Sequence, residues 1–348
     1  MLHTPKRTQP FACIFLAAVL LALAAAAEPA RAGERRPVPA AFRLSAAVAE
    51  EEKNEEDSAD PENGGEDAEA AGPAQEKQPP AGALSAADIL ADATVIAHGM
   101  GAIGDLTTSN CLEGFLAQYE AGVRVFEADL RLTRDCQVVL RHDWWHADWQ
   151  EGISWSNVPT REKFVSTPVL GKYTPLSFRD LLLLMEEYPD ICVITDTKFT
   201  DSDVFTIQFD AMLADARELG LTYLFDRIVV QLYNTNMLAA LNNIYRFPHY
   251  IYTLYQDDFN RTEKALRERA AFCAQWGIEG ITMEASLWKS AYADIAREYG
   301  IRFYVHTVND REKARQLLEG GVAGIYSDHL TPDSLERRKG RGDISVRL

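Results

Sequence analysis

The feature that most constrains the fold is a regular alternation of short apolar segments and longer amphipathic ones, running from about residue 86 to residue 335. The short segments have the length and composition of buried β-strands, and the longer ones have helical spacing. Strands that alternate with helices are typical of a parallel barrel, because each strand needs a crossover before the next. We therefore predict one α/β domain, a (β/α)8 TIM barrel, at residues 89–335. The expected strands are 94–98, 124–130, 191–197, 227–233, 250–254, 280–283, 302–307 and 324–327, and the expected helices are 111–121, 177–187, 202–219, 234–245, 262–276, 290–299 and 311–320.

The chain before this domain has a different character. Residues 1–32 carry a basic start, an Ala/Leu-rich apolar run and a small-x-small end, a pattern typical of a secretory signal peptide. An uncleaved N-terminal membrane anchor is the alternative. Residues 33–88 are acidic, contain Pro and Gly and lack most large apolar side chains, which predicts a disordered linker. We expect an exported protein, extracellular or periplasmic, and association with a membrane surface stays open.

Charge and cysteine content narrow the class of protein further. The net charge is −17 and the pI about 4.9, which argues against a nucleic-acid partner because phosphates attract a basic surface. The basic residues of the tail at 336–348 do not change this expectation. None of the five cysteines has metal-type spacing. A disulfide between Cys111 and Cys136 is one alternative for a chain in an oxidising compartment.

Polar side chains at the ends of the predicted strands point to a functional site. Glu127 and Asp129 are two residues apart on one strand, so both side chains face the same side of it. Inside a barrel, two unpaired carboxylates are costly, and a bound cation stabilises them together. Oxygen ligands suit Mg²⁺ or Ca²⁺, so we predict one divalent cation as cofactor. Other strand ends carry His98, Asp196 with Lys198, Gln231, His306 and Asp328.

Residues 94–143 contain a denser set of polar residues: His98, Asn110, Glu127, Asp129, Thr133, Asp135, His142 and Asp143. This stretch resembles the glycerophosphodiester phosphodiesterase family, within the superfamily of barrels related to phosphatidylinositol phospholipase C. The family pattern opens with a strand that ends in His, continues through an Asn at a helix start and a Glu-x-Asp strand, and closes with a His-Asp pair. These residues match that pattern, and the matching region runs to about residue 332.

The resemblance implies a metal-dependent phosphodiesterase on a TIM barrel. It makes Asp196 the third metal ligand, in a position where the family has Glu, and it places Lys198 near the substrate phosphate. It also implies that His98 and His142 act as an acid–base pair, because one group must activate the nucleophile and another must protonate the leaving oxygen. The implied partner is a small or lipid-derived phosphodiester, in particular a glycerophosphodiester.

One residue departs from the family pattern. Gly99 stands where many members have a phosphate-binding Arg, and Lys198 and Arg141 are the candidates to replace it. The departure also resembles the sphingomyelinase-D-like branch of the superfamily. A phospholipase-D-like or phosphoinositide-cleaving enzyme is therefore one alternative, and a catalytically silent cell-surface binding module is another.

The remaining candidates would line the substrate pocket. Asn110 and Gln231 belong to the matched motif and to a strand end, respectively. Trp144 opens an aromatic loop at residues 144–175, which either packs over the barrel mouth or forms a wall for the substrate. His306 occupies a position where the family usually has Trp, and either binds substrate or fills the rim.

Overall fold

The structure is a computed structural model that describes residues 75–257 and 261–336. The predicted signal or anchor, most of the predicted linker and the tail beyond residue 336 lie outside these ranges. Within the described residues, no helix has both the length and the apolar composition needed to cross a bilayer.

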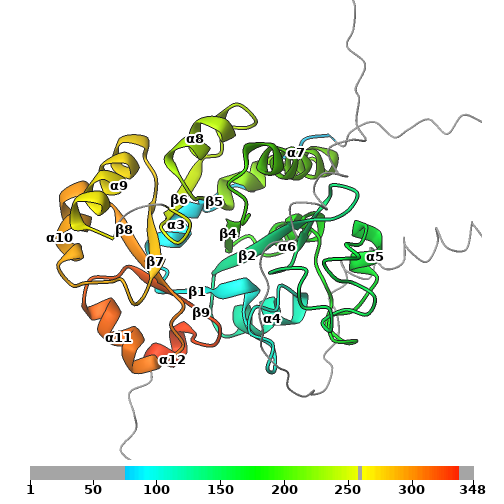
Figure 1. Cartoon of the computed structure of the whole chain (residues 1–348), viewed down its shortest axis with the longest axis horizontal. Coiled ribbons are helices and arrows are strands. Elements are labelled where there is room, and N and C mark those ends of the chain that lie inside the picture. The colour runs from blue at the N-terminus through cyan, green and yellow to red at the C-terminus, as the bar shows by residue number, and fades with distance from the viewer. Residues whose placement is uncertain (1–74, 258–260, 337–348) are drawn as a thin grey trace, which may run out of the picture.

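Eight parallel strands form a closed barrel, which confirms the predicted (β/α)8 fold (Figure 1). Neighbouring strands follow the order of the chain, and β9 returns to pair with β1, where Ile96 is level with Tyr326. On its other side β1 pairs with β2, which closes the ring. The barrel strands are β1 (Val95–Ala97), β2 (Val125–Leu132), β4 (Cys192–Asp196), β5 (Ile228–Leu232), β6 (His249–Thr253), β7 (Gly280–Glu284), β8 (Arg302–His306) and β9 (Gly324–Ser327).

The sequence did not predict the short strand β3 (Val138–Leu140). It pairs antiparallel with the end of β2, with Leu130 level with Leu140 and Leu132 level with Val138. A strand of three residues has too few positions to show a period, which explains why it was missed. The hairpin brings the chain back toward the end of β2, so the residues just after β3 lie close to the barrel mouth.

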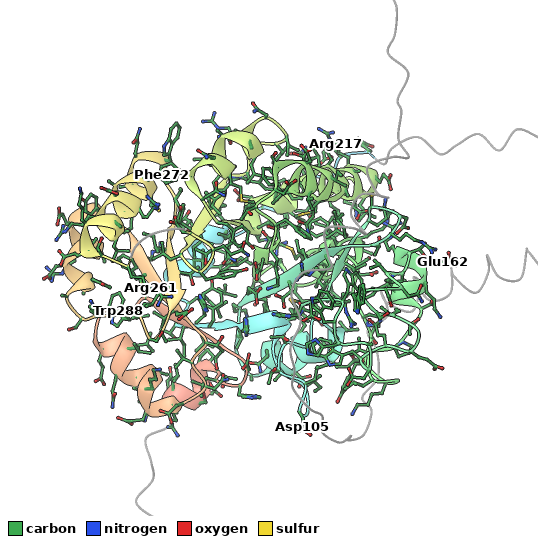
Figure 2. All side chains as sticks on the ribbon, in the orientation of Figure 1. Asp105, Glu162, Arg217, Arg261, Phe272 and Trp288 are labelled. Carbon is green, nitrogen blue, oxygen red and sulfur yellow. The ribbon has the colours of Figure 1, made fainter. Side chains whose placement is uncertain are left out.

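Seven helices cover the outside of the barrel where the sequence predicted them, and Figure 1 shows them as a ring around the strands. Apolar side chains of these helices pack on the outward faces of the strands and form the larger core. Figure 2 shows Glu162 and Arg217 on the periphery of the molecule, away from the strands. The seven are α4 (Leu112–Glu120), α6 (Phe178–Glu187), α7 (Ser202–Leu219), α8 (Thr235–Asn242), α9 (Glu263–Trp276), α10 (Tyr292–Tyr299) and α11 (Arg311–Glu319), and the short helices α5 (Arg161–Val165) and α12 (Pro332–Glu336) lie beside them.

The folded domain includes part of the segment that was expected to be linker. Helix α3 (Ala86–Ala91) begins at a capping box on Ser85 and contributes Ile89 and Leu90 to the small core inside the barrel. The boundary expected at residue 89 falls inside this helix. Upstream, the Lys77 N–H donates to the Gly220 carbonyl at 2.8 Å, so the chain already contacts the domain there.

The cysteines do not form the disulfide that was considered for Cys111. Cys111, Cys192 and Cys273 are buried free thiols. Burial raises the pKa of the Cys111 thiol to about 12. The alternative of a Cys111–Cys136 disulfide is therefore wrong, and Cys111 serves as a small buried side chain at the start of α4.

Candidate active site

Three carboxylates meet at the end of the barrel where the strands finish. Glu127 and Asp129 lie on β2, and Asp196 is the last residue of the neighbouring strand β4, level with Asp129. One oxygen from each carboxylate lies within 4.8 Å of the others, and all three side chains are buried. Burial and the nearby charge of Asp129 raise the pKa of Glu127 to about 8. A divalent cation would relieve this repulsion, so the cluster could hold a metal ion.

Glu127 is held from one side and open on the other. Its Oε2 accepts a hydrogen bond from the Gly99 N–H at 2.6 Å, whereas its buried Oε1 has no hydrogen-bond partner among the described residues. A buried carboxylate oxygen without a partner is costly, and a cation ligated by that oxygen removes the cost.

The geometry also explains the residue that departs from the family pattern. Gly99 has a φ of +52°, and a Cβ placed on it would lie 2.6 Å from the Thr108 Cβ. A side chain at this position is therefore excluded both by the left-handed backbone and by the packing of Thr108. An Arg at position 99 therefore does not fit this chain.

Asp129 and Asp196 are each fixed through one oxygen by buried polar side chains. The Asn110 Nδ2 donates to Asp129 Oδ2 at 2.7 Å, and its Oδ1 accepts from the Asp129 N–H at 3.0 Å. Asp196 Oδ1 accepts from the Gln231 Nε2 at 3.2 Å and from the Tyr233 hydroxyl. Asn110 and Gln231, expected to touch substrate, therefore bond directly to the carboxylates.

Lys198 lies inside the carboxylate cluster. Its Nζ is 2.5 Å from Asp129 Oδ1 and also donates to Asp196 Oδ2. Burial disfavours the charged ammonium, but the charges of Asp129 and Asp196 outweigh this and hold the pKa of Lys198 well above its usual value. Tyr233 accepts a hydrogen bond from the Lys198 N–H at 2.9 Å, which fixes the backbone at this point.

His98 follows β1 and is oriented by a residue at the far end of the domain. Its Nδ1 lies 2.8 Å from Asp328 Oδ1, just after β9, and Asp328 Oδ2 accepts from the Asn309 Nδ2 at 2.6 Å. Burial lowers the pKa of His98, but the hydrogen bond to Asp328 and the charge of Glu127 outweigh this and raise it to about 9. The Nε2 atom of His98 is the one that remains for a ligand.

His142 follows β3 and is held by two neighbours. Its Nδ1 lies 2.7 Å from Asp143 Oδ2, and its carbonyl oxygen accepts from Arg131 Nε at 2.9 Å and from Arg131 Nη2 at 2.7 Å. Asp143 also bonds the Nδ1 of His146 at 2.9 Å. Burial raises the pKa of Asp129, but the charges of Lys198, His142 and His98 outweigh this and lower it. The residues that follow His98 and precede His142 contact the cluster: the Gly99 N–H donates to Glu127, and the Arg141 N–H donates to the Asp129 carbonyl at 2.9 Å.

Arg141 and Trp144 do not join this centre. Arg141 is buried; its Nε donates to the Asp143 carbonyl, its Nη1 to Gln150 Oε1 at 2.7 Å and its Nη2 to the His146 carbonyl at 2.6 Å. These bonds hold the loop after β3 in place. Trp144 is buried in a small separate core with Val139, Ile153 and Phe164.

The same end of the barrel carries His306 and two tyrosines that the sequence did not single out, Tyr233 and Tyr255. Burial lowers the pKa of His306 to about 4, so the ring is neutral near pH 7. Its ring centre lies 6.1 Å from that of Tyr255 and 6.2 Å from that of Tyr326. The Tyr255 hydroxyl lies 3.5 Å from Asp196 Oδ1, which places this side chain beside the carboxylates. Tyr233 and Tyr255 carry no sequence signal, because their role depends on contacts with a different strand.

A closed (β/α)8 barrel with a buried carboxylate cluster and two histidines at the ends of its strands has the arrangement of a barrel enzyme. The sequence profile of the Glycerophosphoryl diester phosphodiesterase family matches residues 101–331. The chain belongs to this family and is a phosphoric diester hydrolase.

Solved structures show the same fold at low sequence identity. A glycerophosphoryl diester phosphodiesterase from Silicibacter pomeroyi is 19% identical, with a TM-score of 0.55 over 69% of this chain and 90% of that one. A glycerophosphodiester phosphodiesterase from Galdieria sulphuraria is 18% identical, with a TM-score of 0.57 over 70% and 96%. A phosphodiesterase from Oleispira antarctica, solved with the product sn-glycerol-3-phosphate, is 15% identical, with a TM-score of 0.54 over 68% and 92%. No curated protein matches the chain.

Proposed function

We propose that this enzyme hydrolyses glycerophosphodiesters or related phospholipid head groups, with one divalent cation, Mg²⁺ or Ca²⁺, and with His98 and His142 as acid and base. The observation that supports it most directly is the carboxylate cluster of Glu127, Asp129 and Asp196, which both histidines approach. The family membership and the sn-glycerol-3-phosphate bound by the Oleispira antarctica protein support a glycerol phosphate as one product.

The residues divide the chemistry between them. The three carboxylates would hold a cation, which would supply positive charge for a phosphate oxygen and lower the pKa of an attacking hydroxyl. His98 and His142 each bond a carboxylate through Nδ1, which orients the ring and leaves Nε2 for the substrate. One Nε2 takes the proton of the attacking water or substrate hydroxyl as the new P–O bond forms. The other gives a proton to the leaving alcohol oxygen as the old P–O bond breaks.

An assay on a substrate panel tests the reaction class. The purified full chain is incubated with glycerophosphodiesters, lysophospholipids and sphingomyelin, each with Mg²⁺, with Ca²⁺ and with a chelator. We expect glycerophosphodiesters to be cleaved and the chelator to stop the reaction. Turnover restricted to sphingomyelin or lysophospholipid would favour the phospholipase-D-like alternative. A folded protein that cleaves none of them with either metal would favour the binding module.

We also propose that the protein is exported and that residues 1–32 act as its signal. The pattern of a basic start, an apolar run and a small-x-small end supports this. N-terminal sequencing of the mature protein tests it: a first residue near position 33 is expected, whereas an intact Met1 or Leu2 would favour the membrane anchor.

A further inference from the structure

When the contacts of Lys198 are set aside, each carboxylate of the cluster has one oxygen that accepts protein hydrogen bonds and one that does not. Asn110 donates to Asp129 Oδ2, and Gln231 and Tyr233 donate to Asp196 Oδ1. The Gly99 N–H donates to Glu127 Oε2. The oxygens left for a cation are therefore Asp129 Oδ1, Asp196 Oδ2 and the partnerless Glu127 Oε1.

The ammonium of Lys198 contacts two of these three oxygens. It forms an ion pair with Asp129 Oδ1 at 2.5 Å, and it donates to Asp196 Oδ2. Divalent cations bind carboxylate oxygens at about 2.0–2.6 Å, so a cation on these two oxygens would lie close to the ammonium, and the two positive charges would repel each other. Each would therefore weaken the binding of the other.

We propose that Lys198 and the divalent cation compete for Asp129 and Asp196, so that metal binding moves the ammonium out of the cluster and toward the substrate phosphate. The inference rests on the proposed metal-dependent function and adds a coupling between its two ligands. Lysine suits such an exchange, because its charge sits at the end of a flexible four-carbon stem.

The surroundings of Lys198 allow the ammonium to move while the backbone stays in place. The residue has a φ of +59°, and its N–H is bonded to the Tyr233 hydroxyl at 2.9 Å. Lys198 lies just beyond the end of β4, at the end of the barrel where the strands finish, and its side chain is 13% exposed. The backbone and packing at Gly99 exclude an arginine there, which leaves the Lys198 ammonium as a cation that could bind a phosphate.

The exchange links metal and phosphate binding. In the wild-type protein, a phosphate anion that holds the displaced ammonium favours the metal-bound form, and by reciprocity the metal favours phosphate binding. In a variant without the Lys198 ammonium, the metal has no ammonium to displace. Such a variant should bind the metal more tightly than wild type in the absence of phosphate, and phosphate should increase its metal affinity less.

Titration calorimetry on the full chain tests this with Mg²⁺ or Ca²⁺, in the presence and absence of inorganic phosphate. The variants are Lys198→Met and Lys198→Gln, with Lys264→Met, an exposed lysine on α9, as the matched control. We expect both Lys198 variants to bind metal about tenfold tighter than wild type without phosphate, within the usual range of coupling effects. We expect phosphate to tighten metal binding in wild type and in Lys264→Met, and to do so less in the Lys198 variants.

The outcomes separate this inference from the proposed function. Metal binding in wild type with equal or weaker binding in folded Lys198 variants would overturn the competition and leave the metal site standing. Absence of any metal binding in wild type would overturn both. Should neither Lys198 variant fold, the wild-type titrations decide alone: a metal affinity that does not change with phosphate overturns the coupling.

Discussion

His98 and Asp328 meet at 2.8 Å although 230 residues separate them in the chain. The contact exists because β9 pairs with β1 and closes the barrel, which brings the end of the last strand beside the end of the first. The closure of the fold is thus also what orients the first histidine of the site. Asp143, by contrast, orients His142 from the next position in the chain.

Replacing a predicted metal ligand should abolish both metal binding and turnover. Asp129→Asn keeps the shape of the side chain but removes the charge of an oxygen in the cluster. We expect a loss of metal affinity greater than the ~10–100-fold typical of residues one step from the metal. Calorimetry and activity assays measure it, with Asp210→Asn, an exposed residue on α7, as the control. Full turnover by the chelated wild-type enzyme would contradict a metal-dependent reaction.

Asn110 should matter for the metal without touching it. Asn110→Ala removes both bonds to Asp129, so the carboxylate loses its fixed orientation. We expect metal affinity to fall about 10–100-fold. Titration calorimetry tests this against Asn236→Ala, an exposed asparagine on α8. If Asn110 binds substrate instead, as the sequence suggested, the metal affinity will stay unchanged and only KM will rise.

The two histidines should be separable by the leaving group. His98→Ala and His142→Ala are each expected to slow turnover about 10²–10⁴-fold, because each removes a proton-transfer group. A substrate with a more acidic leaving alcohol should partly rescue the variant that lacks the general acid and not the other. Steady-state kinetics measure this, with the exposed His329→Ala as a control. Near-wild-type turnover by both folded variants would rule out the two-histidine mechanism.

Arg141 should stabilise the loop after β3. Arg141→Met leaves the acceptors on Asp143, His146 and Gln150 without their donor. We expect the free energy of unfolding to fall by about 1–3 kcal/mol or more, the cost of unsatisfied buried groups. Urea denaturation measures it, and Arg134→Met, on an exposed side chain, is the control. A phosphate-binding Arg141 predicts the reverse: unchanged stability and a raised KM.

One pH dependence of stability should arise away from the site. The hydrogen bond that the protonated His249 ring donates to the Glu279 carboxylate raises the pKa of His249 above its usual value of about 6.5, although burial opposes it. The stabilisation is therefore fully present below about pH 6.5 and is lost as the pH rises through the folded-state pKa. His249→Gln should destabilise the protein by about 0.2–1 kcal/mol at pH 5.5 and less at pH 9. Denaturant unfolding at both values checks this; an effect that grows with pH would contradict it.

Local patterns were sufficient for most of the fold. The eight barrel strands and the seven outer helices lie where apolar spacing predicted them, because the period of side-chain burial is a property of each segment. The strand β3 was not predicted, because three residues are too few to show a periodic pattern of burial. The shared orientation of Glu127 and Asp129 also followed from the sequence, because alternate residues of a strand face one side.

The roles of the other polar residues depended on the closed barrel. Sequence named Lys198 and Arg141 as candidates for a phosphate and favoured Lys198. In the structure Lys198 reaches the carboxylates, whereas Arg141 bonds its own loop. From the sequence, Gly99 is only a position that lacks the family arginine. The structure adds the reason, because Thr108 packs against Gly99 and leaves no room for a side chain. Sequence thus determined the positions of the eight barrel strands and the strand faces that carry charged side chains. Tertiary structure decided which charges meet, because contact between strands depends on their order and register around the ring, which no single segment encodes.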